Sequence, residues 1–258
     1  MTGTVHVCWS PRISEVPPAD WLDATERERF GRLRRVEDRR GLLTSRVLLK
    51  TLVGRLSDSP PELVHLSYDC FRCGRPHGRP VVVDPQAAVR WQVSLSHTDD
   101  HVMVAATDAG PVGVDAESAA ATGFDGFDDV ALTSTERTEV EHCRPAAQSR
   151  ARAIYWTRKE AVLKAAGSGL AVDPTALEVS APHLPPALTA WHADEPQPTS
   201  VQIIDVPVGG DHVAAVAVLA DAPCTLALHM PPGSGWEQDR QRRLTQPSDE
   251  QVTGFHYG

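Results

Sequence analysis

A membrane-spanning segment is the first thing that this sequence lacks. No apolar run in its 258 residues approaches the roughly 20 residues that a helix needs to cross a bilayer. Residues 1–12 contain no charged stretch followed by an apolar one, so no export signal is visible. Cysteine is scarce, and the five cysteines are scattered and odd in number, which favours a reducing compartment over a disulfide framework. We therefore expect a cytoplasmic protein with no membrane partner.

An excess of positive charge is also missing. The formal net charge is −9, which argues against a nucleic-acid partner because phosphate backbones select basic surfaces. Residues 27–55 are the exception, with ten basic side chains against three acidic ones. A basic, helical-looking segment in an acidic protein predicts an anionic ligand or an acidic partner. The alternative is that these arginines form a solvated helical face.

No residue-level repeat is present, but the expected elements occur twice in a similar order. In the first part we expect helices over 20–33 and 36–56 and strands over 5–9, 63–68, 81–83, 93–95 and 102–107. In the second part we expect helices over 134–143 and 147–166 and strands over 112–117, 201–206, 212–219 and 225–229. This order predicts an α+β fold of two halves, 1–109 and 110–230, followed by a polar, poorly ordered tail over 231–258.

A pair of acidic residues marks the first strand of the second half. Side chains alternate along a strand, so Asp115 and Glu117 point to the same side. Two neighbouring carboxylates oppose each other's ionisation unless a cation lies between them. Hard oxygen ligands favour Mg²⁺ or Mn²⁺, and Mg²⁺ takes one or two carboxylates together with substrate phosphates. The alternative is a solvated strand edge in an acidic protein.

The segment Trp156–Leu170 predicts a helix that ends at Gly167 and Gly169. Residues four apart are neighbours on a helix, so Glu160 and Lys164 share a face. On its own this pair is typical of a surface ion pair. Read together with the acidic strand, it indicates half of a metal and phosphate site.

Two further segments offer groups for an anion. Ser96 and His97 follow a strand and can donate hydrogen bonds to an oxyanion, and Gly78-Arg79-Pro80 presents a cation on a stiff turn. Cys70, Cys73 and His77 have zinc-ligand spacing, but no second Cys-x-x-Cys follows to supply a fourth ligand. A zinc loop that binds nucleic acid is therefore a weaker reading, and the overall acidity opposes it.

Taken together, these motifs resemble the Sfp-type 4′-phosphopantetheinyl transferases. The family has a G-[IV]-D-x-E strand and, some forty residues later, a W-[ST]-x-K-E-[AS]-x-x-K-x-x-G-x-G-L helix. Gly113–Glu117 and Trp156–Leu170 match every defined position. Weaker matches are found in the F-[ST]-x-x-E segment, the G-[KR]-P turn, the [NS]-[IL]-S-H strand end and the basic helix of the first half, at residues 132–136, 78–80, 94–97 and 38–50. The resemblance covers residues 20–220.

The resemblance implies two similar α+β halves packed as a pseudo-dimer in one chain, with coenzyme A between them. It implies an enzyme that transfers the phosphopantetheine arm of coenzyme A to a serine of apo acyl or peptidyl carrier proteins, of polyketide or nonribosomal peptide synthesis. It further implies that Mg²⁺, or Mn²⁺, is held by Asp115, Glu117 and Glu160. The ion would neutralise charge at the reacting phosphorus.

The family's other roles can be carried over residue by residue. Lys164 would contact the phosphates and stabilise the leaving adenosine 3′,5′-bisphosphate, and Glu160 or Glu136 would take the proton of the carrier serine. The implied coenzyme A contacts are Arg40, Arg46, Arg79, Ser96, His97, Lys159 and Lys164. Two residues depart from the family pattern: Leu132 replaces an aromatic residue, and Ala116 replaces a large aliphatic one.

Carrier proteins are acidic, so the arginines of the first half are also expected to steer docking. The resemblance implies a monomer. The alternative is a non-catalytic module that keeps the fold and binds an acidic partner through its basic helix. Intact acidic and lysine positions at 115, 117, 160 and 164 argue against that alternative.

Overall fold

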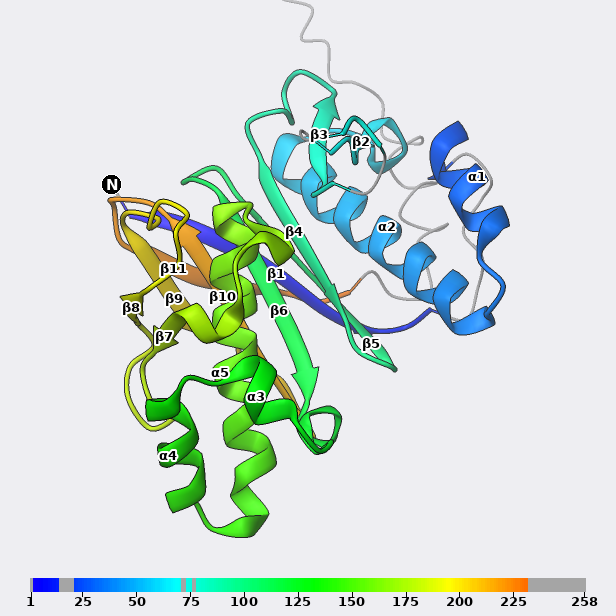
Figure 1. Ribbon diagram of the computed structural model, residues 1–258. Coiled ribbons are helices and arrows are strands. Elements are labelled where there is room, and N and C mark those ends of the chain that lie inside the picture. Colours follow the sequence, from blue (N-terminus) through cyan, green and yellow to red (C-terminus); the bar gives the residue numbers. More distant parts are fainter. Residues whose placement is uncertain (1, 14–20, 71–72, 76–77, 232–258) are drawn as a thin grey trace, which may run out of the picture.

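Two β-sheets pack against each other, and a long helix covers the outer face of each (Figure 1). The computed structural model describes residues 2–13, 21–70, 73–75 and 78–231. The first sheet has the order β11 (Cys224–His229), β1 (Gly3–Pro11), β5 (His101–Thr107), β4 (Gln92–His97). The second has the order β6 (Val112–Ser118), β10 (His212–Leu219), β9 (Val201–Asp205). This mixed architecture with two halves confirms the predicted α+β class.

Alternation along the strands divides the apolar residues into separate cores. On β5, Val102 and Val104 face the helix of the first half, whereas Met103 and Ala105 face the second sheet. The same alternation on β6 and β10 sends a second set of side chains into the layer between the sheets, namely Val112, Val114, Ala116, Ala214, Val216 and Val218. The halves are therefore joined by a continuous apolar layer, and the outer face of β6 is left for polar groups.

The first half is completed by helices that enclose its core. Helix α1 (Ala24–Arg32) begins at Asp23 with a capping box closed by Glu26, and α2 (Val36–Ser57) lies over β4 and β5. A short hairpin of β2 (His65–Ser67) and β3 (Val81–Asp84) borders this core. The helix and strand positions follow the predicted ones to within a few residues.

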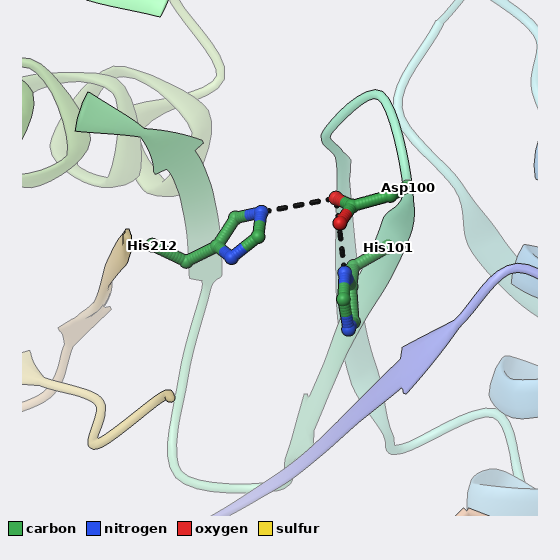
Figure 2. Close-up of side chains that lie close together, drawn as sticks. All are labelled: Asp100, His101 and His212. Carbon is green, nitrogen blue, oxygen red and sulfur yellow. Dashed lines mark hydrogen bonds and ion pairs between the residues drawn. The ribbon is translucent and has the colours of Figure 1, made fainter. Parts of the chain in front are cut away.

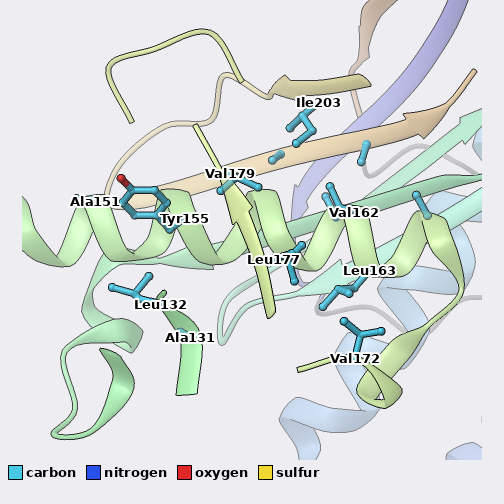
Figure 3. Close-up of a cluster of buried hydrophobic side chains, with 14 of the residues drawn as sticks. Ala131, Leu132, Ala151, Tyr155, Val162, Leu163, Val172, Leu177, Val179 and Ile203 are labelled. Carbon is cyan, nitrogen blue, oxygen red and sulfur yellow. The ribbon is translucent and has the colours of Figure 1, made fainter. Parts of the chain in front are cut away.

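The second half is organised around α5 (Pro145–Ala166), which packs on β6 and β10. Its core contains Tyr155, Val162 and Leu163 of this helix (Figure 3). They pack with strands β7 (Leu177–Val179), β8 (Leu188–Trp191) and β9. Two shorter helices, α3 (Phe127–Ala131) and α4 (Ser134–His142), precede α5. Among the described residues, no helix combines the length and apolarity needed to cross a membrane.

Three features differ from the sequence prediction. Helix α3 and the β7–β8 hairpin are absent from it, because segments of three to five residues are too short to show periodicity. Residues 224–229 were placed in the second half, but they pair in parallel with β1 in the sheet of the first half. The predicted tail lies outside the described residues from 232 onward.

Gly113 allows α5 to lie directly on β6. A Cβ atom at this position would lie 2.0 Å from the carbonyl oxygen of Ala161 and 2.4 Å from the amide nitrogen of Ala165. Both are backbone atoms of α5, so no side-chain rotation can relieve the clash. The glycine of the acidic motif therefore sets the distance between the two elements that carry the acidic residues.

Replacing Gly113 with alanine should force α5 away from β6. We expect G113A to lower the free energy of unfolding by roughly 3 kcal/mol or more, at the upper end of overpacking effects, as measured by urea denaturation. Gly209→Ala is the matched control, because a Cβ there would have no heavy atom within 4 Å. Equal stability of the two variants would contradict the close approach.

Candidate active site

Asp115 lies where β6 meets both the first half and helix α5. Its Oδ1 atom accepts a hydrogen bond from Ser96 Oγ at 2.7 Å, across the boundary between the halves. The same oxygen accepts a bond from Lys164 Nζ at 2.7 Å. Ser94 strengthens the boundary, because its Oγ accepts the N–H of Val114 at 3.1 Å. One carboxylate thus joins β4, β6 and α5.

Glu117 and Glu160 surround this carboxylate from the strand and from the helix. Burial raises the pKa of Glu160, and the charge of Asp115 raises it further, while Lys164 lowers it. Burial likewise raises the pKa of Glu117, and Asp115 contributes to that rise, against a hydrogen bond from the N–H of Ser118. The charge of Asp115 therefore opposes the ionisation of both glutamates.

The donor set fits a hard divalent cation. Asp115 Oδ2 is buried and accepts no hydrogen bond from any described residue, although its other oxygen has two partners. Asp115 and Glu160 share Lys164 as an adjacent cation, and Glu117 lies close enough to Asp115 to be affected by its charge. An Mg²⁺ ion would use the unpaired oxygen and relieve the repulsion, since oxygen ligands are what this ion prefers.

Positive charge reaches the site from both halves. Helix α5 ends at Gly167 in the left-handed conformation, with φ of 71°, as predicted. A Cβ atom on this glycine would lie 3.7 Å from Nη1 of Arg79, so the predicted cationic turn of the first half is next to the end of α5. Lys164, one turn before that end, keeps 31 % of its side chain exposed. A phosphate ligand could contact both cations.

Arg12 extends this positive region along α2, beside the ring of His97. The ring of His97 contacts the carbonyl oxygen of Gly41 at 3.3 Å, and a Cβ on Gly41 would lie 3.7 Å from the Arg12 guanidinium carbon. Burial lowers the pKa of His97 to about 4, and the positive charges of Arg12, Arg46 and Lys164 lower it as well. His97 is therefore neutral at pH 7 and available as a hydrogen-bond donor.

The predicted arginines of the basic helix have different environments. Arg40 is exposed and is available to a ligand. Arg46 is buried, pairs with Glu26 at 2.7 Å and lies 4.2 Å from the ring centre of Tyr68. It also lines a cavity of about 260 Å³ beside α1. Lys50 shares the same Glu26 at 3.0 Å, so Arg46 belongs to a buried charge cluster.

Glu136 and Lys159 differ most from their predicted roles. Each is buried, and the two form an ion pair with each other. Glu136 also accepts the N–H groups of Thr133 and Val179, while Lys159 donates to the carbonyl oxygens of Ala131 and Pro174. These contacts occupy both carboxylate oxygens. The structure therefore places this pair in the packing of the second half, whereas the sequence predicted a coenzyme A contact for Lys159 and proton acceptance for Glu136.

Ser96 also differs in part from its prediction. Its hydroxyl donates a hydrogen bond to Asp115, and the residue as a whole is only 6 % exposed. Ser96 therefore orients the carboxylate of Asp115 instead of facing a ligand. Sequence reasoning missed Arg12, whose guanidinium donates to the carbonyl oxygens of Glu37 and Thr98. In the sequence Arg12 is only a single arginine after the first strand. Its position near His97 depends on the tertiary fold.

Comparison with known proteins agrees with this arrangement. Residues 111–217 match the family model described as the 4′-phosphopantetheinyl transferase superfamily. Residues 7–109 match the model described as 4′-phosphopantetheinyl transferase, N-terminal. A protein of Synechocystis sp. that is named for 4′-phosphopantetheinyl transferase activity is 27% identical over 152 residues. The aligned part spans 58% of this chain and 58% of that relative.

The two family models adjoin at the boundary between the halves, and the residues of the candidate site lie on both sides of it. The chain belongs to the 4′-phosphopantetheinyl transferase family. The acidic strand and the α5 helix both fall within the superfamily match.

Removing one of the three carboxylates should stabilise the protein when no divalent ion is present. The pKa of Glu160 is raised in the folded state, so stability falls as pH rises through the window between the ordinary and the raised value. E160Q should therefore melt at a higher temperature than the unsubstituted protein at pH 7 in EDTA. Glu141→Gln, at an exposed position of α4, is the control and should change little.

The same pair of variants tests the cation. A 100-fold excess of Mg²⁺ over its Kd should stabilise the unsubstituted protein and E141Q by about 2.7 kcal/mol. E160Q should gain much less, because it lacks one ligand. An equal gain for E160Q and E141Q would contradict a site that includes Glu160.

The neutral state of His97 is open to direct measurement. Titration of its imidazole by NMR should give a midpoint near 4, below the ordinary value of about 6.5. Arg12→Gln removes one of the positive charges that lower this pKa, so the midpoint should move upward in that variant. A midpoint at the ordinary value in both proteins would contradict the described surroundings of the ring.

Proposed function

We propose that this protein transfers the phosphopantetheine arm of coenzyme A to a serine of apo acyl or peptidyl carrier proteins, with release of adenosine 3′,5′-bisphosphate. The observation that carries the proposal is the group of three carboxylates and Lys164 at the boundary of the halves, with an unpaired buried oxygen on Asp115. Such a group suits a cation and a pyrophosphate. We further propose the Sfp type, in which a single chain carries both halves.

Asp115, Glu117 and Glu160 would hold Mg²⁺ or Mn²⁺, and the ion would neutralise charge that develops on the phosphates. Lys164, which pairs with Asp115 at 2.7 Å and is partly exposed, would contact the phosphates and stabilise the leaving bisphosphate. Glu160 is half-buried and its pKa is raised, which suits a group that accepts a proton from the carrier serine. Phosphoryl transfer depends mainly on such positioning and charge stabilisation.

Arg79, Arg40, Arg12 and His97 would bind the nucleotide phosphates of coenzyme A. His97 is neutral when the site is empty of anions, because burial lowers its pKa and three cations lower it further. A bound phosphate would offset those charges and strengthen the hydrogen bond that the ring donates. This arrangement suits a dianionic group better than a neutral one.

The remaining parts of the proposal concern partners and setting. The exposed arginines of the first half would meet an acidic carrier protein and steer its approach. We propose carriers of polyketide or nonribosomal peptide synthesis, a monomeric enzyme and a cytoplasmic location. The few, scattered cysteines of the sequence support the last of these.

The test is a transfer assay with Mg²⁺, coenzyme A and several apo carrier proteins, read by the mass of the carrier. The unsubstituted protein should add one phosphopantetheine arm per carrier. E160Q and K164Q should lose at least about 100-fold in rate, as expected for groups that stabilise the transition state. E141Q is the matched control and should retain the full rate.

Two results would contradict the proposal. One is the absence of transfer to any carrier, and the other is an undiminished rate in both E160Q and K164Q. A non-catalytic binding module would bind carriers equally well with and without Glu160 and would transfer nothing, so carrier affinity is measured in parallel. EDTA should abolish transfer, and added Mg²⁺ should restore it.

A further inference from the structure

A second group of side chains that could bind a metal ion lies close to β6, the strand that carries Asp115 and Glu117. Asp100 is in the turn between β4 and β5, His101 begins β5, and His212 begins β10 (Figure 2). The first two belong to the first half and the third to the second half. The proposed transfer reaction uses none of them.

The ligand atoms of this cluster converge. Asp100 Oδ1 lies 3.0 Å from Nδ1 of His101 and 3.0 Å from Nε2 of His212, and all three atoms lie within 4.8 Å of one another. Four ligands at about 2.0 Å around a tetrahedral zinc ion are separated by about 3.3 Å. The two distances from Asp100 Oδ1 are slightly shorter than this separation, and the two imidazole nitrogens lie within 4.8 Å of each other, so the observed spacing is close to that of a zinc site.

Both imidazole rings are held in place by packing. The indole of Trp9 stacks on His101 at 4.5 Å between ring centres with an interplanar angle of 7°, and it meets His212 edge-on at 5.3 Å. The turn that carries Asp100 is fixed by Thr98, whose hydroxyl donates to Asp100 Oδ1 at 2.9 Å. Ligands that are already oriented lose little freedom on binding an ion.

One nitrogen of the cluster lacks a hydrogen bond. Nδ1 of His101 is buried and has no hydrogen-bond partner with acceptable geometry among the described residues, although Asp100 Oδ1 lies 3.0 Å away. Its approach to the carboxylate is thus close but poorly aligned. The side chain of Asp100 is 60% exposed, which leaves an entry path and a position for water as the fourth ligand.

From this geometry we propose that Asp100, His101 and His212 form a site for a divalent transition-metal ion of the zinc class. Two imidazoles and one carboxylate are nitrogen and oxygen ligands that such ions favour, in contrast to the all-oxygen set around Asp115. Glu117 interacts electrostatically with both Asp99 and His212, so both acidic residues lie near the cluster. Their negative charge attracts the ion.

The ion would connect the halves beside the catalytic strand. His212 is paired with Ser118 on β6, and the next pair joins Val213 to Glu117. A metal bound to His101 and His212 would therefore fix β5 against the strand that supports the acidic residues. The role of this site is structural, so it does not depend on the proposed transfer.

Zinc itself is the probe. Metal binding is measured by calorimetry with Mg²⁺ in excess, in protein that carries Cys70→Ser and Cys73→Ser so that these thiols cannot compete. This background protein should bind one equivalent and melt at a higher temperature with zinc. H101Q and H212Q should each weaken binding by about 10–100-fold or more and lose the thermal shift. His183→Gln, at an exposed position, is the matched control.

X-ray absorption of the zinc-loaded background protein gives a readout that does not depend on the folding of any variant. The spectrum should show two imidazole nitrogens with oxygen ligands and no sulfur. Absence of zinc binding in the background protein would overturn the proposal. So would affinity that is unchanged in both H101Q and H212Q, or a zinc environment without imidazole, which would assign the ion to the carboxylates around Asp115.

Discussion

The carboxylate of Asp115 holds the two halves and the helix in a single arrangement. One oxygen accepts Ser96 from the first half and Lys164 from α5, and the other oxygen is buried without a partner. Removing one partner of a buried, charged hydrogen bond is costly, because the other partner stays buried with neither water nor a hydrogen bond. The same residue therefore fixes the boundary between the halves and keeps an oxygen available for a cation. Structure and proposed chemistry depend on the same atom.

The fold could be read from the sequence wherever an element was long and periodic. The two long helices and the strands of both sheets were predicted to within a few residues, because alternation and helical spacing show which face is buried. Alternation places Ala116 on the opposite side of the strand from the carboxylates, and it packs in the layer between the sheets. The pairing of residues 224–229 with β1 could not be read, since strand partners depend on tertiary contacts and not on local pattern.

The site was predictable in its acidic part and not in its basic part. Asp115 and Glu160 are close because a glycine lets the helix lie on the strand, and both elements were visible in the motifs. Lys159 and Arg46 carry charges that look equally suitable for a phosphate, yet each has a buried glutamate as its partner. No local pattern identifies these partners, because Lys159 is 23 residues from Glu136 and Arg46 is 20 residues from Glu26. Whether a cation faces solvent or a buried acid is decided by the packed structure.

The parallel pairing of β11 with β1 also bears on how the protein forms. Gly3 is paired with Cys224, so the sheet of the first half includes a segment made after almost all of the described chain. During synthesis β1 would have an unpaired edge until residues 224–229 emerge, and exposed edges of this kind invite pairing with other chains. Contacts between residues so far apart in the sequence slow folding, because the chain loses the entropy of closing the loop before the contacts can stabilise it. The two halves therefore resemble repeated units in shape, but they are obliged to complete their folding together.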